Sequence, residues 1–308
     1  MNYATLYDVK QQLGLTATTD DALLQKWIAR STALVDWWKG RRYDIVKDTK
    51  RFDVPNNSRS FGDVASGETT QSELLFHPTR NSIQLPDLLS AIEVLNGDGE
   101  EILSTEYLLK PYNETPKSHI LLKNSVYWVP DDDGNYENAI SVEGYWGFHS
   151  NYSNCFVGSG DTVLNAAGLL ASSLDTSIQV ADVNGIANDL ISPRFSAGHV
   201  IRLSSVNGIE FCHIITATAV VGSNDILSVV RGYNGTSPLV HPVGTVIELF
   251  RPEDRIVQTV IRLVQWRYRQ KDANTFDKIF DAGAQQTIIP SALPADVERI
   301  LGTRKFVL

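Results

Sequence analysis

The sequence predicts an α+β fold. Helices from the N- and C-terminal ends of the chain pack together with a small antiparallel sheet, and an all-β sandwich or barrel domain is inserted between them. Two observations support this prediction. Apolar residues recur at three- and four-residue steps in residues 18–42 and 252–271. Between these segments lie short apolar runs of strand length, separated by turn signals.

The first long helix, predicted for residues 18–42, has one apolar face. Leu24, Ile28, Val35 and Trp38 fall on this face, and Gly40 is a suitable stop. A helix of this length is marginal alone in water, so the face needs a large partner surface. Trp37 lies off the face, and we therefore expect it to point elsewhere, at another subunit.

The last long helix, predicted for residues 252–271, is apolar on more than one face. Pro252 suits its first position. Two apolar faces indicate burial on two sides. We expect one side to contact the opening helix and the other the sheet or a neighbouring subunit, where Trp266 is a candidate interface residue.

The region between the helices divides into two β regions. A strand is predicted at 50–54, followed by a mobile loop at 55–72 because that stretch is rich in Ser, Gly and Asn. Further strands are predicted at 73–76, 82–85, 91–95, 107–110, 119–122 and 139–143. Residues 157–250 are poor in charge, with strands at 177–183, 200–204, 210–215, 226–230 and 245–249, and Asn207-Gly208 indicates a hairpin.

These patterns predict a domain organisation. Residues 1–156 and 251–308 form one domain, and residues 157–250 form a β domain inserted into it, because helical sequence resumes directly after residue 250. Residues 283–308 are predicted as an extended C-terminal tail that includes one short helix at 294–301.

The net charge of −9 is unevenly distributed. Residues 1–52 and 251–308 are mildly basic, with nine basic against six acidic groups and ten against seven. Residues 53–156 carry five basic and sixteen acidic groups, and residues 157–250 carry three and seven. The acidic middle disfavours a surface that grips nucleic acid, because phosphate binding needs clustered Lys and Arg. Improved solubility is the simplest interpretation of the acidic charge.

No pattern of catalytic or metal-ligating residues is recognisable. The six histidines are dispersed, the two cysteines are widely spaced, and nucleotide-binding and nucleophile-elbow motifs are absent. The Asp131–Asn135 run resembles a calcium loop, but Tyr136 stands where that loop needs Gly. We therefore predict no catalytic residue, no metal and no cofactor, and expect a protein that is not an enzyme. No apolar run is long enough to cross a bilayer, so no membrane partner is expected.

Three separated stretches carry a resemblance. They are LYDVKQQLGLTATTDDALLQKWIARSTALVDWWKGRRYD, then SIQLPDLLSAIEVLNGDG with YLLKPYN and SVEGYWGFHS, and finally PEDRIVQTVIRLVQWRYRQKDANTF with LPADVERIL. In this order they resemble the head–tail connector (adaptor, or neck) proteins of tailed bacteriophages. The resemblance covers about two-thirds of the chain, everything except the inserted β domain.

The resemblance implies a virion protein of the neck, assembled in the host cytoplasm. It implies a homo-oligomeric ring, usually a dodecamer, that binds the portal protein and the next neck or tail protein. DNA passes through its centre without sequence-specific binding. The C-terminal segment would reach the portal, which makes Arg304, Lys305, Phe306 and Val307 the candidate docking residues. Two alternatives stay open: a virion-surface binding module whose β insert recognises glycan or another structural protein, and a tail-associated hydrolase.

Overall fold

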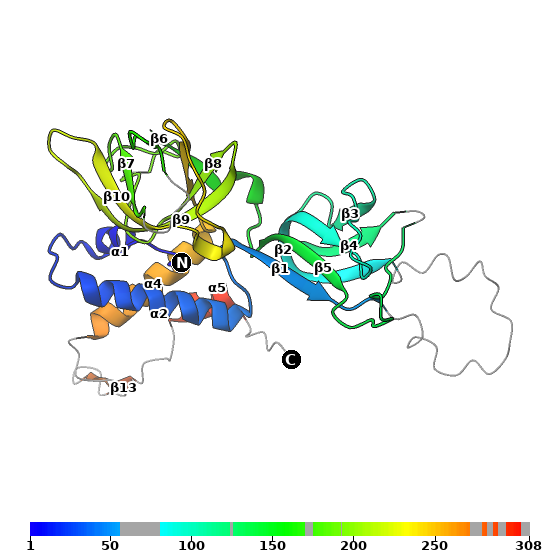
Figure 1. Ribbon diagram of the computed structural model, residues 1–308. Helices are drawn as coiled ribbons and strands as arrows, with labels where there is room; N and C mark the ends of the chain where they lie inside the picture. Colours follow the sequence, from blue (N-terminus) through cyan, green and yellow to red (C-terminus); the bar gives the residue numbers. More distant parts are fainter. Residues whose placement is uncertain are drawn as a thin grey trace. The chain divides into compact units, whose positions relative to one another are not determined.

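The computed structural model describes residues 1–55, 81–123, 126–169, 175–191, 193–271, 279–281, 286–288 and 294–302. The chain forms two compact units (Figure 1). Residues 45–152 make up one unit, and residues 1–44 together with 153–308 make up the other. The described elements are helices and antiparallel sheets, which confirms the predicted α+β class.

The unit of residues 45–152 is built on a five-stranded antiparallel sheet with the order β1-β5-β2-β4-β3. Its strands are β1 (Val46–Phe52), β2 (Ser82–Leu95), β3 (Tyr107–Lys110), β4 (Lys117–Leu122) and β5 (Ile140–Trp146). Along β5 every second residue is buried, as expected for a strand with one face on a core. Gly144 is required there, because a Cβ would lie 2.6 Å from the Ser90 carbonyl oxygen.

The predicted strands at 82–85 and 91–95 are two halves of one strand, β2. Asp87 has a positive φ of 47°, and the pairing register of β2 shifts beside it. This irregularity lets one long strand pair with β4 at one end and with β5 at the other. Trp146 of β5 is buried, and its indole donates to the Asp48 carbonyl at 2.8 Å.

The helices all belong to the other unit. They are α1 (Leu6–Leu13), α2 (Asp21–Lys39), α4 (Asp254–Gln270) and α5 (Ala295–Leu301). Each of α1, α2 and α5 contacts α4, and α2 makes the largest contact, so the predicted packing of the first and last long helices is confirmed. Gly40 ends α2 in the left-handed conformation, as the sequence predicted. Its buried face carries Leu24, Ile28 and Val35.

The second sheet of this unit curls into a half-barrel, and Figure 1 shows the helices as a layer along it. Its order is β6-β11-β8-β9-β10-β7. The strands are β6 (Phe156–Thr162), β7 (Ser177–Val180), β8 (Val200–Ser205), β9 (Gly208–Thr218), β10 (Asp225–Val230) and β11 (Val246–Phe250). Just after β6, the Leu164 amide donates to the Gln179 carbonyl of β7 at 2.8 Å, which links the two edges of the curled sheet.

The compact units divide the chain differently from the predicted domains. The helices group with the half-barrel, whereas the predicted organisation grouped them with the first sheet. The observed grouping follows from contacts in the folded chain. The connection between half-barrel and helices is also short, because β11 ends at Phe250 and α4 begins at Asp254. Within the predicted tail, α5 is a packed helix with Val297 and Leu301 buried. A short hairpin, β12 (Ile279–Asp281) and β13 (Gln286–Ile288), precedes it.

Several predictions fall on residues outside those described. They are most of the loop at 55–72, the strand at 73–76 and the docking residues Arg304, Lys305, Phe306 and Val307.

Candidate functional site

The outer face of α2 is the candidate interface. Lys26, Arg30, Ala33 and Trp37 recur at intervals of three or four residues, so they lie in one line along the helix. All four are exposed, and Trp37 is 54% exposed. We call these four residues the α2 outer stripe. Trp and Arg are the residue types that most often dominate binding energy at protein interfaces.

Among the described residues, the cations of the α2 outer stripe form no ion pair with a carboxylate. The carboxylates nearest the start of α2 are already bound: Asp20 accepts hydrogen bonds from Tyr268 at 2.7 Å and Lys271 at 2.6 Å. Asp21 pairs with the Lys10 ammonium at 2.8 Å.

Arg267 of α4 adds a third cation beside the stripe. Burial lowers the pKa of Arg267, and the charge of Arg30 lowers it further. Its guanidinium donates to the Ser31 hydroxyl at 3.3 Å. Within the described ranges, Lys26, Arg30 and Arg267 have no carboxylate within ion-pair distance. The arrangement therefore attracts an anionic surface.

The C-terminal end of α2 contacts the C-terminal end of α5. The Trp38 indole donates to the Gly302 carbonyl at 2.9 Å, and Lys39 donates to the Ile300 carbonyl at 3.4 Å. These bonds fix the end of α5 against the end of α2. The predicted docking residues, from Arg304 to Val307, follow directly but lie outside the described residues.

The two predicted interface tryptophans differ in exposure. Trp37 is exposed on α2, as its position off the apolar face indicated. Trp266, on α4, is partly buried. Trp38, which the sequence placed on the apolar face, is also only partly buried. Trp37 and Trp38 contact edge to face, with ring centroids 6.4 Å apart.

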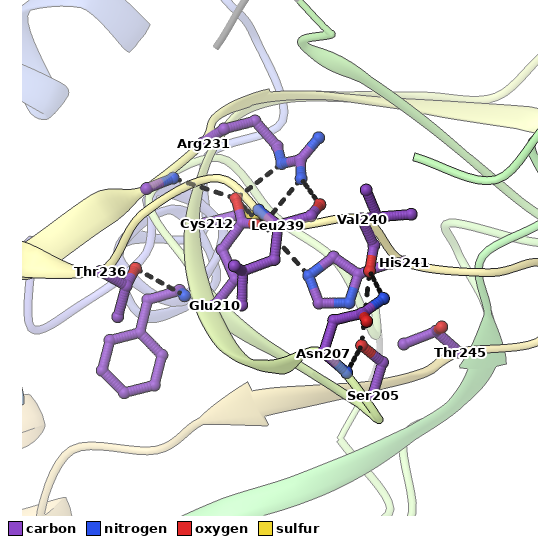
Figure 2. A network of polar contacts seen from close by, with 12 residues as sticks. Ser205, Asn207, Glu210, Cys212, Arg231, Thr236, Leu239, Val240, His241 and Thr245 are labelled. Atoms are coloured by element: carbon purple, nitrogen blue, oxygen red, sulfur yellow. Dashed lines mark hydrogen bonds and ion pairs between the residues drawn. The ribbon is translucent and has the colours of Figure 1, made fainter. Parts of the chain in front are cut away.

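A fully buried charged network lies inside the half-barrel (Figure 2). The Glu210 carboxylate of β9 accepts two hydrogen bonds from the Arg231 guanidinium, at 2.6 and 2.7 Å. It lies 3.1 Å from the His241 ring, and the Leu239 amide donates to it at 2.8 Å. The side chains of Glu210, Arg231 and His241 are all 0% exposed.

The electrostatics of this network follow from its geometry. Burial raises the pKa of Glu210, but the hydrogen bonds from Arg231 and His241 outweigh it and lower the pKa to about 2. Arg231 also donates to the Leu239 carbonyl at 2.6 Å. Figure 2 also shows a second set of hydrogen bonds, in which the side chains of Ser205 and Asn207 both donate to the Val240 carbonyl. The network therefore holds residues 231–241 against β9 and the β8–β9 turn.

The network contains a cysteine and a histidine, but their arrangement does not suit nucleophilic catalysis. Cys212 lies 3.4 Å from Glu210 and donates its thiol hydrogen to it. Burial raises the pKa of this thiol well above its ordinary value, and the charge of Glu210 raises it further. The network is enclosed on all sides, so we assign it a structural role.

Sequence reasoning missed this network because its members are 21 and 31 residues apart in the chain. One signal was present: Glu210 lies within a strand, and Arg231 directly follows one, in a region that otherwise carries few charges. A charge in such a strand is expected to have a buried partner.

A second buried cluster joins the N-terminal segment to α2. The Tyr3 hydroxyl donates to the Asp36 carboxylate at 2.6 Å and accepts from the Tyr43 amide at 2.8 Å. Burial raises the pKa of Asp36 to about 6, against the lowering effect of the Tyr3 hydrogen bond. Asp44, which is also buried, is bound by the Arg42 guanidinium at 2.6 Å. This cluster makes the stability of the helical layer sensitive to pH.

The part of the chain that the structure describes shows neither a metal site nor a membrane-spanning helix. No group of three or more His, Cys, Asp or Glu side chains there could hold a metal ion. None of the helices there is long and apolar enough to span a membrane. Comparison of the chain with protein-family models, with curated proteins and with solved structures finds no match.

Proposed function

We propose that this chain is a structural virion protein that forms a ring below the portal, joins a phage head to its tail and lines the DNA exit channel. The proposal rests on the resemblance of three stretches to head–tail connector proteins. The observation that supports it is the packing of α2 against α4, which brings together the first and third of these stretches in one helical layer.

Two features of the helical layer support the proposal. A ring needs an exposed surface for its neighbouring subunit, and the α2 outer stripe with Trp37 supplies one. It also needs a segment that reaches the portal. Trp38 and Lys39 hold the end of α5 against α2, so residues 303–308 start from a fixed point. We propose that Arg304, Lys305, Phe306 and Val307 bind the portal, and that Trp266 contributes to the subunit interface.

The proposed partners and location follow from the same resemblance to head–tail connector proteins. They are other copies of this chain, the portal protein, the next neck or tail protein and the DNA that passes through the channel. The location is the virion neck. No catalytic step and no cofactor belong to this function.

Electron microscopy of the purified chain, alone and mixed with portal rings, tests the proposal. Rings with a central channel, stacked on one face of the portal, are the expected result. Monomers that leave the portal rings undecorated would contradict it. A glycan array probed with the same protein addresses the alternative: specific glycan binding without portal binding would replace the connector by a virion-surface binding module.

A further inference from the structure

The net negative charge of the chain lies entirely in one compact unit. Residues 45–152 contain eight Lys and Arg against 17 Asp and Glu, a net charge of −9. The other unit, residues 1–44 and 153–308, contains 19 basic and 19 acidic residues and is neutral. Such segregation within one chain provides two surfaces of different electrostatic character.

Two adjoining turns concentrate this negative charge. Asn96 connects them: its side chain donates to the Tyr127 carbonyl at 2.9 Å and accepts from the Val129 amide at 3.0 Å. Gly97 lies so close to Pro130 that no side chain would fit there. The turns therefore form one edge, which we call the acidic edge. Its carboxylates belong to Asp98, Glu100, Glu101, Asp131, Asp132 and Asp133.

The acidic edge has no cations of its own. Neither turn contains Lys or Arg. Its six carboxylates form no ion pair with any described residue. Asp132 and Asp133 are exposed, as are Asp98, Glu100 and Glu101. Repulsion among these carboxylates is relieved when a cationic surface approaches.

We propose that the acidic edge of one copy binds the α2 outer stripe of a neighbouring copy, with Lys26, Arg30 and the adjacent Arg267 supplying the positive charge. The inference rests on the proposed ring and names the surfaces that form it. Charge complementarity selects a second copy as the occupant: among the described residues, Lys26 and Arg30 form no ion pair, and neither do the six carboxylates of the acidic edge. A contact between two different surfaces of identical subunits is heterologous, and such contacts generate a closed ring when the rotation between neighbouring subunits closes.

Charge reversal tests the contact between copies. The stripe variant is Lys26→Glu with Arg30→Glu, and the edge variant is Asp132→Lys with Asp133→Lys. Sedimentation velocity of the full chain at about 50 mM salt measures self-association, because the Debye length is then long enough for exposed charges to act. We expect each variant to associate at least about tenfold more weakly than the wild type.

The decisive sample is an equimolar mixture of the two variants. In the mixture, each reversed surface finds a partner of opposite charge on the other variant, so association should return to within about threefold of the wild type. A control variant, Arg51→Glu with Arg299→Glu, changes the net charge by the same amount as the stripe variant at exposed positions elsewhere. It should associate like the wild type.

Several outcomes would overturn the inference. They are a wild type that stays monomeric at all salt concentrations, stripe and edge variants that associate like the wild type, and a mixture that associates no better than either variant alone. Binding of duplex DNA that is lost only in the stripe variant, with unchanged self-association, would assign the stripe to nucleic acid. Each of these leaves the proposed function to be judged separately, by the presence of the protein in particles.

Discussion

The buried network in the half-barrel gives the sharpest stability prediction. Arg231→Met removes a guanidinium that bonds Glu210 at 2.6 and 2.7 Å and leaves the carboxylate in a site that is 0% exposed. Loss of one partner of a buried ion pair typically costs about 3–5 kcal/mol, because the remaining charge is uncompensated. Glu210 keeps its hydrogen bonds from the Leu239 and Gly232 amides and from the side chains of His241 and Cys212. These bonds keep the expected loss at about 3 kcal/mol, the lower end of that range.

A matched control lies on the same half-barrel. Arg202 pairs with Glu248 at 2.7 Å, but the two side chains are 25% and 23% exposed. Arg202→Met should therefore cost less than about 1 kcal/mol. Protection of β9 and β10 amides from hydrogen exchange, measured at pH 7, reports the stability of the half-barrel directly. Equal losses in the two variants would refute the reasoning.

The same pair predicts a pH dependence. Because the pKa of Glu210 is lowered to about 2 in the folded state, from 4.5, its contribution is fully present above 4.5 and is lost as the pH falls towards 2. In Arg231→Met this contribution of Glu210 to stability is absent. The difference in the free energy of unfolding between variant and wild type should therefore shrink as the pH falls. A difference that stays constant between about pH 6 and pH 3 would contradict the assignment.

Three further predictions concern the helical layer. Asp36→Asn should stabilise the protein at pH 7.5 by about 1 kcal/mol, allowing for solvent screening, because the raised pKa of about 6 makes the ionised carboxylate costly. Because of Asp36, the free energy of unfolding of the wild type should rise as the pH falls through about 6 towards 3.8. Urea titrations over this pH range that show no such rise would contradict the prediction. Trp38→Ala should cost about 2 kcal/mol, less than the ~3–5 for a fully buried aromatic, because the ring is only partly buried; an unchanged denaturation midpoint would show that its bond to Gly302 contributes nothing. Deleting residues 303–308 should leave the melting temperature unchanged and abolish binding to portal rings, and retained portal binding in a pull-down would move the docking role elsewhere.

Much of the fold follows from local periodicity. The helices α2, α4 and α5 were each predicted, because their apolar spacing and their Gly and Pro signals are local. The β8–β9 hairpin was predicted from Asn207-Gly208, although its two turn residues are Val206 and Asn207. Strand β3 has the predicted bounds, Tyr107–Lys110.

The features that sequence reasoning missed depend on contacts between distant residues. No strand was predicted for the residues of β6, where Gly158, Ser159 and Gly160 favour strands poorly, yet pairing with β11 holds β6 in the sheet. The buried pair of Glu210 and Arg231 is invisible to periodicity for the same reason. The grouping of the helices with the half-barrel likewise follows from tertiary contacts that no local pattern encodes.

The candidate interface was partly predictable. The position of Trp37 off the apolar face of α2 indicated its exposure, because helical geometry alone fixes which residues share a face. That no described carboxylate pairs with Lys26 or Arg30 was not predictable. It depends on Asp20 and Asp21 being bound by Lys271 and Lys10, which only the folded chain reveals.

The copy number of this protein in purified virions tests the proposed connector role most directly. Quantitative mass spectrometry against the portal protein gives this ratio. A connector ring predicts a ratio near one to one with the portal. A ratio far above one would indicate a tube or decoration protein, and absence from the particles would contradict the structural role altogether.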